Sequence, residues 1–375
     1  MIVHIPDYQL GYRIFSLAFS DHAGREFIEQ GLDYLCVRDG ALYAFPDEVC
    51  ITNDEEIVQR IMSCAEYSVF EISDNGSAYL YFDASSDDNT FIITGKCNSN
   101  CIMCPDNEYV RSHGRMANIE ALLSIIDHIP YYENHFTITG GEPFLMGKDI
   151  FRFFAALKDK FPFADYLLLT NGRIFSVLEY ARLMAETMPE KTMIGIPVHG
   201  YNEASHDAIT QTAGSFRQTI AGIKQLLSRG LHIEIRIVVS KISAPYISQI
   251  AELIVNELTR VDCVKIMGIE MLGSAHINQD KLWISYREAF IHVREAIRIL
   301  LLHGVDTALY NFPLCAVDRE YWNVTRKSIS EWKIRFPEAC ASCTVKDACG
   351  GLFAGSFRFA QNDVTPVSEE CKYDD

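Results

Sequence analysis

From about residue 90 the chain alternates short β-branched runs with amphipathic helical patterns, and this alternation restricts the fold more than any other feature. Parallel strands need a long crossover between them, which a helix normally supplies, so the pattern predicts repeated βα units in an α/β fold. Periodicity leaves two architectures open, a doubly wound open sheet and a complete or partial barrel. The predicted strands are NTFIIT (89–94), HFTIT (135–139), ADYLLLT (164–170), KTMIGIPV (191–198), HIEIRIVVS (232–240) and CVKIMGI (263–269).

Amphipathic stretches between these strands, and one stretch after them, predict the helices. Asn118 is the predicted N-cap of the first helix, and Gly230 is the predicted end of the fourth. The helical patterns are NIEALLSIIDHI (118–129), KDIFRFFAALKDKF (148–161), IFSVLEYARLMAETM (174–188), SFRQTIAGIKQLLSRG (215–230), YISQIAELIVNEL (246–258) and SYREAFIHVREAIRILLLHG (285–304).

Three regions follow from these patterns. Residues 1–88 read as a small α+β region that ends in the polar stretch DASSDDN, which is typical of a linker. Residues 89–304 hold the βα units. Residues 305–375 are irregular, rich in Cys and Gly, and too poor in periodic pattern to build a core unaided, so this segment needs a staple that cysteines could supply.

Charge and cysteine usage narrow the class of protein. A net charge of -17 without a dense run of Lys and Arg argues against nucleic acid as a partner. We expect a soluble cytosolic protein, because the N-terminus lacks the pattern of a signal peptide and no apolar run reaches the roughly 20 residues that span a bilayer. A reducing cytosol makes clustered thiols candidate metal or redox ligands. The isolated cysteines are predicted to be small buried hydrophobes: Cys36, Cys50, Cys64 and Cys263.

Three cysteines follow the first predicted strand in the spacing C-x3-C-x2-C: Cys97, Cys101 and Cys104. Three thiolates on one loop can hold three corners of a cubane iron-sulfur cluster and leave the fourth iron open to a substrate. The alternative is a zinc site in which a remote histidine such as His113 is the fourth ligand. The spacing alone leaves both interpretations open.

A Gly-Gly-Glu-Pro turn follows the second predicted strand in TITGGEPFL. Gly140 and Gly141 allow the backbone to come close to a ligand, and Glu142 together with exposed carbonyls can accept hydrogen bonds from an ammonium group. Pro143 completes the turn. Taken alone, such a turn at a strand end is weak support for a binding site.

Together, C-x3-C-x2-C after the first strand and GGEP after the second resemble the radical S-adenosylmethionine (SAM) superfamily. The resemblance implies a partial (β/α)6 barrel and a 4Fe-4S cluster on the three cysteines, with SAM bound to the open iron through its amino and carboxylate groups. It also implies that one-electron reduction cleaves SAM to methionine and a 5′-deoxyadenosyl radical. An electron donor such as flavodoxin or ferredoxin is implied as a partner.

The resemblance extends to further SAM-binding positions. Gly140, Gly141, Glu142 and Pro143 match the turn that binds the SAM amino group. Arg236 resembles a basic residue that pairs with the SAM carboxylate, although an Arg inside a strand is often an ordinary ion-pair partner. The other matching positions are Thr170 and Asn171 beside SAM, and Gly268 and Ile269 at the adenine. Where the family often has Ser and Asp, this chain has His199 and Gly200, so no ribose contact is assigned there.

A second set of cysteines lies near the C-terminus, where Cys340, Cys343 and Cys349 follow C-x2-C-x5-C and Cys315 lies upstream. Four thiolates can fully ligate a zinc ion or a second iron-sulfur cluster, and spacing does not separate the two. The pattern resembles the SPASM or shorter twitch extensions of peptide-modifying radical SAM enzymes, which implies one auxiliary 4Fe-4S cluster. Cys371, in an acidic tail, is expected to be unliganded.

Longer stretches resemble the radical SAM maturases of His-Xaa-Ser systems (HxsC). The similarity lies in CNSNCIMCPD (97–106), in residues 206–241 and in FPLCAVDREYW (312–322) with the cysteines that follow. It implies a ribosomally made peptide with His-Xaa-Ser repeats as substrate and a second radical SAM maturase as partner. The bond that is made and the catalytic residues stay unknown. Two alternatives remain, a radical SAM enzyme for a small molecule or RNA base, and a non-catalytic zinc-binding module.

Overall fold

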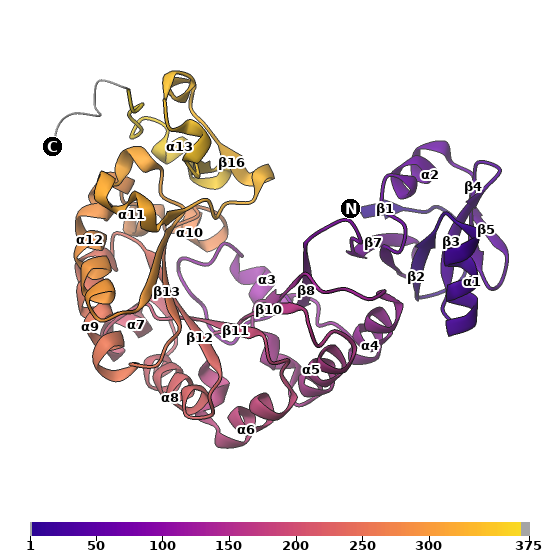
Figure 1. Ribbon diagram of the computed structural model, residues 1–375, viewed down its shortest axis with the longest axis horizontal. Coiled ribbons are helices and arrows are strands. Elements are labelled where there is room, and N and C mark those ends of the chain that lie inside the picture. Colours follow the sequence, from indigo (N-terminus) through magenta and orange to yellow (C-terminus); the bar gives the residue numbers. More distant parts are fainter. Residues whose placement is uncertain (1, 369–375) are drawn as a thin grey trace. The chain divides into compact units, whose positions relative to one another are not determined.

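The computed structural model describes residues 2–368 and divides into two compact units (Figure 1). The first unit consists of Met1–Thr94, Arg115–Leu168 and Glu186–Thr192. The second unit consists of Gly95–Gly114, Leu169–Ala185 and Met193–Asp375. The prediction for Cys371 falls outside the described residues.

The N-terminal part of the first unit contains a seven-stranded sheet in the order β1-β7-β6-β2-β3-β4-β5. β2 and β3 run parallel, and the other neighbours run antiparallel. With its two helices this sheet forms the α+β region that the sequence predicts. The elements are β1 (Ile2–His4), β2 (Arg13–Ala18), α1 (Asp21–Gln30), β3 (Tyr34–Arg38), β4 (Ala41–Phe45), β5 (Val49–Thr52), α2 (Glu55–Met62), β6 (Val69–Ile72) and β7 (Ser77–Phe82).

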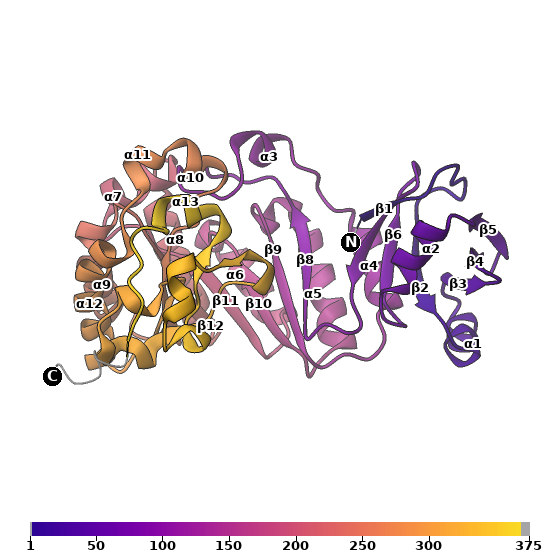
Figure 2. The same cartoon turned by 90° about the horizontal axis from the view of Figure 1, so that it is seen from above.

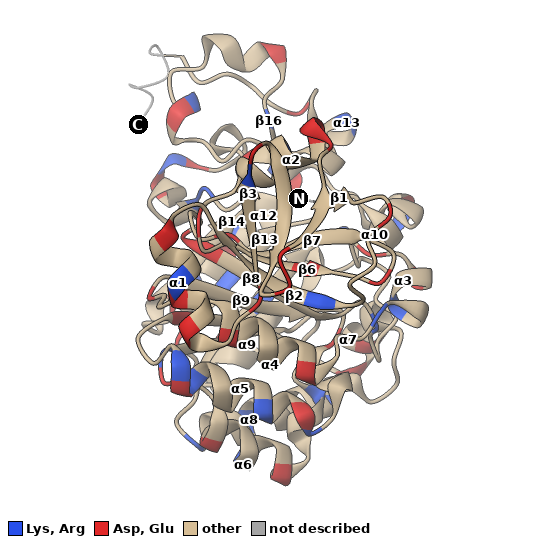
Figure 3. Ribbon diagram, turned by 90° about the vertical axis from the view of Figure 1, so that its right-hand side faces the viewer, with Lys and Arg blue, Asp and Glu red and all other residues tan. Residues whose placement is uncertain are grey.

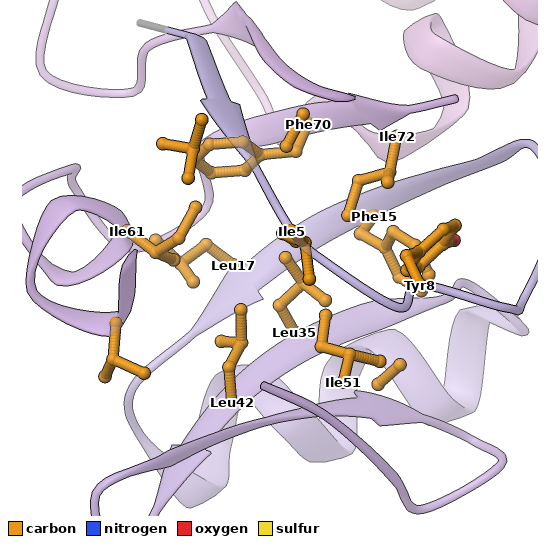
Figure 4. Packing of buried hydrophobic residues seen from close by; sticks show 14 of the residues in the cluster. Ile5, Tyr8, Phe15, Leu17, Leu35, Leu42, Ile51, Ile61, Phe70 and Ile72 are labelled. Atoms are coloured by element: carbon orange, nitrogen blue, oxygen red, sulfur yellow. The ribbon is translucent and has the colours of Figure 1, made fainter. Parts of the chain in front are cut away.

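This sheet has a hydrophobic core of its own (Figure 4). Phe15 and Leu17 alternate along β2, and both are fully buried against Leu35 and Leu42 from the neighbouring strands. Burying a side chain of this size stabilises a fold by about 1.5–3 kcal/mol. The N-terminal region therefore does not depend on a metal or a disulfide for its packing.

A second sheet has eight strands in the order β15-β14-β13-β12-β11-β10-β9-β8. Neighbouring strands run parallel from β8 to β10 and from β11 to β15. The order has two ends, so the described residues form an α/β half-barrel rather than a closed barrel. The strands are β8 (Asp88–Thr94), β9 (His135–Gly140), β10 (Asp165–Leu169), β11 (Thr192–Pro197), β12 (His232–Val239), β13 (Cys263–Gly268), β14 (Asp306–Tyr310) and β15 (Thr325–Arg326).

All six predicted strands are confirmed as β8 to β13, whereas β14 and β15 were not predicted. The segment from residue 305 was expected to be irregular, and that expectation is wrong over Asp306–Tyr310. β14 has only one β-branched residue, Thr307, among its five, so its sequence does not show the pattern of a strand. It forms because it pairs in parallel with β13 and buries Ala308 and Leu309.

The six predicted helices are confirmed as α4, α5, α6, α8, α9 and α12. Asn118 caps α4, since its Oδ1 accepts hydrogen bonds from the N–H groups of Glu120 and Ala121. Gly230, with φ 75°, lies just beyond the end of α8. The bounds are α4 (Ile119–His128), α5 (Asp149–Lys160), α6 (Leu178–Thr187), α8 (Ser215–Leu227), α9 (Ile247–Glu257) and α12 (Tyr286–Leu302).

Four short helices between these elements were not predicted. They are α3 (Glu108–His113), α7 (Glu203–Thr210), α10 (Gly273–Ile277) and α11 (Gln279–Leu282). Each is too short to show a helical period in the sequence. Three of them, α3, α7 and α10, border the loop of the first three cysteines, as described below.

The C-terminal part of the second unit is built mainly from short 3-10 turns: η4 (Leu314–Ala316), η5 (Arg319–Val324), η6 (Glu331–Lys333), η7 (Glu338–Ser342), η8 (Lys346–Ala348) and η9 (Ala354–Ser356). A two-residue pairing joins β16 (Ile334–Arg335) to β17 (Leu352–Phe353). α13 (Phe357–Ala360) lies beside α10 and α11 in both views (Figures 1 and 2). Ser356 fastens this contact, because its Oγ accepts from the N–H of Met271 and donates to the carbonyl of Ile269.

Acidic and basic residues are interspersed over the helices and loops (Figure 3). Many form surface ion pairs, such as Arg152 with Glu120 and Lys224 with Glu257. Within residues 2–368, no helix combines the length and the hydropathy that crossing a bilayer requires.

Candidate functional site

The three predicted cysteines lie in the loop between β8 and α3, in the second unit. Cys97, Cys101 and Cys104 are partly exposed as residues. Burial, and then negative charge on Cys97 and Cys104, raise the pKa of the Cys101 thiol to about 12. Cys97 and Cys104 therefore lie within electrostatic range of Cys101.

One side of this cysteine loop (95–107) is fastened to the last turn of α7. The N–H of Asn100 donates to the carbonyl of Thr210, and the N–H of Ile102 donates to the carbonyl of Ile209, both at 3.0 Å. α7 in turn begins with a capping box at Asn202. Carbonyls that would be unpaired at a helix end thus hold the loop.

A second side of the cysteine loop is fastened to α10. The N–H of Ser274 donates to the carbonyl of Cys104 at 3.0 Å. The side-chain amide of Asn278 donates to the carbonyl of Ile102 at 3.1 Å. These bonds fix the backbone on both sides of Met103, and they come from residues about 170 positions away in the chain.

Close packing supports the same contact. Gly273 opens α10 with φ 52°, and a Cβ there would lie 2.1 Å from the carbonyl oxygen of Pro105, so only glycine fits. Ile102 and Met103 pack against a buried hydrophobic cluster that comprises Ile269, Met271, Ala275 and Leu282.

Thr170 and Asn171 lie directly after β10, as predicted. Thr170 is buried. The side-chain amide of Asn171 donates to Oδ1 of Asn98 in the cysteine loop at 2.7 Å. Arg173 adds two bonds from Nη1, to the carbonyl of Asn98 at 2.8 Å and to Oγ of Ser99 at 3.0 Å. The residues that follow β10 therefore contact the cysteine loop.

The GGEP turn lies at the end of β9, in the first unit. Gly140 has φ 139°, and a Cβ there would lie 2.3 Å from the carbonyl oxygen of Thr94. The N–H of Gly141 donates to that same oxygen at 2.7 Å. Glu142 is 2% exposed, and its carboxylate caps the 3-10 turn η1 (Pro143–Met146). The first glycine is therefore required by the close approach of two strand ends.

The remaining SAM-binding candidates lie on β12 and β13, in the second unit. Arg236 forms an ion pair with Glu234, Nε to Oε1, at 2.6 Å. Gly268 ends β13, and a Cβ there would lie 2.7 Å from the carbonyl oxygen of Asn311. Ile269 is 3% exposed and belongs to the cluster against which the cysteine loop packs. Arg236 thus has the ion-pair role that is common for an Arg in a strand.

His199 and Gly200, where the family often has Ser and Asp, follow β11. The N–H of His199 donates to Nδ1 of His206 at 3.2 Å. Burial lowers the pKa of His199 to about 3, with a further contribution from His206, and burial lowers that of His206 to about 4. Nδ1 of His199 is buried and makes no hydrogen bond to any described residue. Both imidazoles are therefore neutral at pH 7.

The C-terminal cysteines come together around one small cavity. Cys315 lies in η4, Cys340 lies in η7, and Cys343 and Cys349 directly follow η7 and η8. Burial raises the pKa of both the Cys315 and the Cys340 thiols, and charge on the neighbouring cysteines raises both further. Other residues that line this cavity include Pro313, Phe336, Val345, Leu352 and Val364. The four cysteines that the sequence grouped thus share one largely apolar pocket.

Two backbone N–H groups point at one of these sulfurs. Sγ of Cys349 accepts hydrogen bonds from the N–H groups of Leu314 and Gly351, both at 3.4 Å. Backbone hydrogen bonds therefore fix the position of this sulfur at the cavity.

No group of three or more His, Cys, Asp and Glu side chains in residues 2–368 is arranged so that it could hold a metal ion. The ligand roles of the seven clustered cysteines thus stay predictions. His113, the alternative zinc ligand, is exposed, and its ring stacks on that of Tyr109. Among the isolated cysteines, Cys64 and Cys263 are buried as predicted.

For Cys50 the prediction of burial is wrong, and Cys36 is only partly buried. Cys50 lies on the edge strand β5, where one face of the strand is open to solvent. Sequence reasoning also missed the polar residues that hold the cysteine loop: Asn98, Arg111, Arg173, Ser274 and Asn278. Only Asn98, inside the cysteine spacing, and Arg173, two residues after Asn171, had a position that could have drawn attention to them.

Comparison with characterised proteins gives one curated relative, an AdoMet-dependent heme synthase from Nitratidesulfovibrio vulgaris (strain Hildenborough). The two sequences are 27% identical over 150 residues, which are 40% of this chain and 39% of that protein. The chain therefore matches well under half the length of this relative.

Among solved structures, Streptococcus suis SuiB bound to S-adenosylmethionine is 13% identical, with a TM-score of 0.47 over 59% of this chain and 50% of that one. SuiB bound to its precursor peptide SuiA is 12% identical, with a TM-score of 0.48 over 76% and 60%. The enzyme anSMEcpe with bound AdoMet and a peptide is 16% identical, with a TM-score of 0.46 over 59% and 62%.

A comparison with protein families matches the part of the chain from β8 to α9, which includes the cysteine loop. Residues 91–254 match the model of the radical SAM superfamily. This range begins within β8 and includes the three cysteines, the GGEP turn, Asn171 and Arg236. Over residues 91–254 the chain is therefore similar to the radical SAM superfamily.

Proposed function

We propose that this protein is a radical SAM enzyme that cleaves SAM reductively and uses the resulting radical to modify a ribosomally synthesised peptide with His-Xaa-Ser repeats. One observation carries the first half of the proposal. Three thiols lie on a single loop, two of them within electrostatic range of Cys101, and this loop is fastened by residues from α7, α10 and the end of β10.

The donor set fits a cluster with one open iron. Cys97, Cys101 and Cys104 supply three thiolates and no fourth protein ligand is needed, because SAM would take the remaining position. The hydrogen bonds to the loop backbone hold the ligands in place before the metal binds. Such preorganisation reduces the conformational entropy that metal binding must overcome.

Other residues would bind and orient SAM. The carbonyls of the GGEP turn would accept hydrogen bonds from the SAM ammonium group. Since Glu234 occupies Nε of Arg236, the SAM carboxylate would be bound by the Nη groups. Thr170, Asn171, Gly268 and Ile269 would complete the site. When bound, the 4Fe-4S cluster supplies the electron that cleaves SAM to methionine and a 5′-deoxyadenosyl radical.

An auxiliary 4Fe-4S cluster on Cys315, Cys340, Cys343 and Cys349 is part of the proposal. The shared cavity and the two amide bonds to Sγ of Cys349 support it. A zinc ion on the same thiolates is the alternative. The metal content of the purified protein distinguishes the two.

The peptide substrate rests on the sequence resemblance to His-Xaa-Ser maturases. Its other proposed partners are a second radical SAM maturase and an electron donor such as flavodoxin or ferredoxin, in the cytoplasm. We also propose three functional regions. Residues 1–88, which have their own hydrophobic core, would recruit the substrate; residues 89–304 would carry the SAM chemistry; and residues 305–375 would carry the auxiliary cluster.

Anaerobic purification and reconstitution test the proposal. We expect about eight iron and eight sulfide per chain with absorption near roughly 400 nm, as for two four-iron clusters. Addition of SAM and dithionite should produce 5′-deoxyadenosine. A colourless protein with stoichiometric zinc and no 5′-deoxyadenosine would contradict the enzyme and favour the zinc-binding module.

The substrate needs a separate experiment. The chain is co-expressed with a short protein that carries His-Xaa-Ser repeats, and the peptide is analysed by mass spectrometry. A mass change that depends on Cys101 supports peptide modification. SAM cleavage without any change in the peptide would favour a small-molecule substrate.

A further inference from the structure

Arg111 is a buried cation within the fold of the cysteine loop. It lies in α3, seven residues after Cys104, and is 5% exposed. Its carbonyl accepts a hydrogen bond from the N–H of Cys97 at 3.0 Å. Its guanidinium donates to Oδ1 of Asn100, the residue before Cys101, and to the carbonyl of Asp106, two residues after Cys104. The arginine is thus attached to the cysteine loop at three points.

The guanidinium has only neutral partners in the described part of the chain. Nη1 donates to the carbonyl of Asp106 and to Oγ of Ser274 at 3.1 Å, and Nη2 donates to Oδ1 of Asn100 at 2.5 Å. Nε is buried and makes no hydrogen bond to any described residue. No carboxylate within residues 2–368 forms an ion pair with Arg111.

A buried charge without a counter-charge is strongly unfavourable. A lysine or histidine can escape this penalty by losing its proton, but an arginine stays charged at any physiological pH. The compensating negative charge must therefore come from a group that binds near Arg111. The thiolates of the neighbouring loop are such a group once they hold a metal.

We propose that Arg111 is the built-in counter-ion of the iron-sulfur cluster on Cys97, Cys101 and Cys104, and that its charge makes this cluster easier to reduce. This inference rests on the proposed function. Reduction adds one negative charge to the cluster, and a fixed positive charge nearby stabilises the reduced form more than the oxidised form. Arg111 acts through the cluster and is a positioning residue, not a catalytic one.

A purely structural role makes a different prediction. If Arg111 only ties the loop together, its hydrogen bonds to Asp106, Ser274 and Asn100 are what count, and the charge is incidental. Arg111→Lys keeps the charge but loses most of the forked hydrogen bonding. Arg111→Met keeps the apolar stem and loses the charge. The pair of variants therefore separates charge from hydrogen bonding.

The test is a redox titration of the full-length reconstituted protein, monitored by electron paramagnetic resonance. The signal that changes when SAM is added identifies the cluster on the cysteine loop. At the potential where the wild type is half reduced, we expect Arg111→Met to show an about tenfold lower ratio of reduced to oxidised cluster, a shift of about 59 mV for one electron. Arg111→Lys should stay close to the wild type.

A matched control removes an arginine elsewhere. Nη1 of Arg229 also donates only to neutral oxygens, at the end of α8, so Arg229→Met makes the same change in charge away from the cysteine loop. It should leave the titration unchanged. Iron content is measured for every variant, so that loss of the cluster is distinguished from a shift in its potential.

Each outcome decides the inference. A shifted or iron-free Arg111→Met beside a normal Arg111→Lys supports it. It is overturned if both variants titrate like the wild type, if both shift equally, or if neither takes up iron. A wild type that loads and responds to SAM while Arg111→Met is unshifted overturns this inference alone. A wild type that takes up no iron removes the proposed function as well.

Discussion

The two groups of cysteines in the second unit are held in opposite ways. The loop of Cys97, Cys101 and Cys104 is fastened by polar groups from elements far away in the chain, α7, α10 and the end of β10. The group of Cys315, Cys340, Cys343 and Cys349 is held by 3-10 turns of its own segment, and the two amide bonds to Sγ of Cys349 come from residues of that same segment. The first group has three thiols and the second has four.

This difference matches the difference between an open and a closed metal site. A site with a missing ligand must keep its geometry while a substrate comes and goes, so support from the surrounding half-barrel is needed. A site with four thiolates is closed by its own ligands, and the metal can itself hold an otherwise irregular segment together. We therefore expect substitutions in the first group to reduce SAM cleavage. Substitutions in the second group should reduce stability and the coupling of SAM cleavage to peptide modification.

The largest effect should come from Cys101→Ala. It removes one of the three proposed protein ligands, and no other cysteine of the loop can replace it, so SAM cleavage should fall below detection. The measurement is 5′-deoxyadenosine formed under anaerobic conditions with dithionite. Cys50→Ala, at an exposed position on β5, is the control and should retain the wild-type rate. Wild-type production by the Cys101 variant would show that the cysteine loop is not the SAM site.

Cys343→Ala should separate the two groups. The closed site loses its cluster, iron falls to about four per chain, and the peptide product is lost, whereas some uncoupled SAM cleavage remains. Iron analysis, 5′-deoxyadenosine and peptide mass are measured on the same preparation. Full product formation by this variant would reduce the C-terminal cysteines to a structural role, and complete loss of SAM cleavage would show that the two groups are not independent.

Acid should weaken the support of the first group through His206, which lies on α7, the helix whose carbonyls hold Asn100 and Ile102. Burial lowers the pKa of His206 from 6.5 to about 4. Between these two pH values the imidazole is protonated in the unfolded chain and neutral in the folded chain. Stability is therefore lost as pH falls from about 6.5 towards 4. Between pH 7 and pH 5 the loss due to this residue should be about 2 kcal/mol.

The measurement is urea unfolding of the wild type and of His206→Gln, whose side-chain oxygen can still accept from the N–H of His199. Because the variant lacks the buried imidazole, its stability should decrease less on acidification. His292→Gln, on α12, is the control substitution. Identical pH dependence of the wild type and the His206 variant would rule out this source of acid sensitivity.

The sequence predicts what is periodic or spaced, and it misses what is assembled from distant residues. Strands β8 to β13 alternate with helices that are long enough to show a period. β14 has only one β-branched residue, Thr307, and α10 has only five residues, so both form because of their neighbours. The cysteines, the GGEP turn and Asn171 follow from motif and strand end. Asn278 contacts the loop only through the tertiary fold, so no local pattern marks it. Arg111 lies next to the loop in the sequence, but its hydrogen bond to Ser274 depends on the tertiary fold.

The smallest expected effect concerns Asn278, and it tests whether α10 supports only the first group of cysteines. Its side-chain amide donates to the carbonyls of Ile102 and Ser274, at 3.1 and 2.9 Å. Asn278→Ala leaves the Ile102 carbonyl without this partner, which should destabilise the closed loop by about 1 kcal/mol. If opening of the loop limits metal loss, iron should leave the first site several-fold faster under a chelator. Asn323→Ala, at an exposed position on η5, is the control. The release of iron from the auxiliary site should be unchanged, because none of its four cysteines is held by α10. If iron left both sites faster by the same factor, the two groups of cysteines would open together and would not be supported separately.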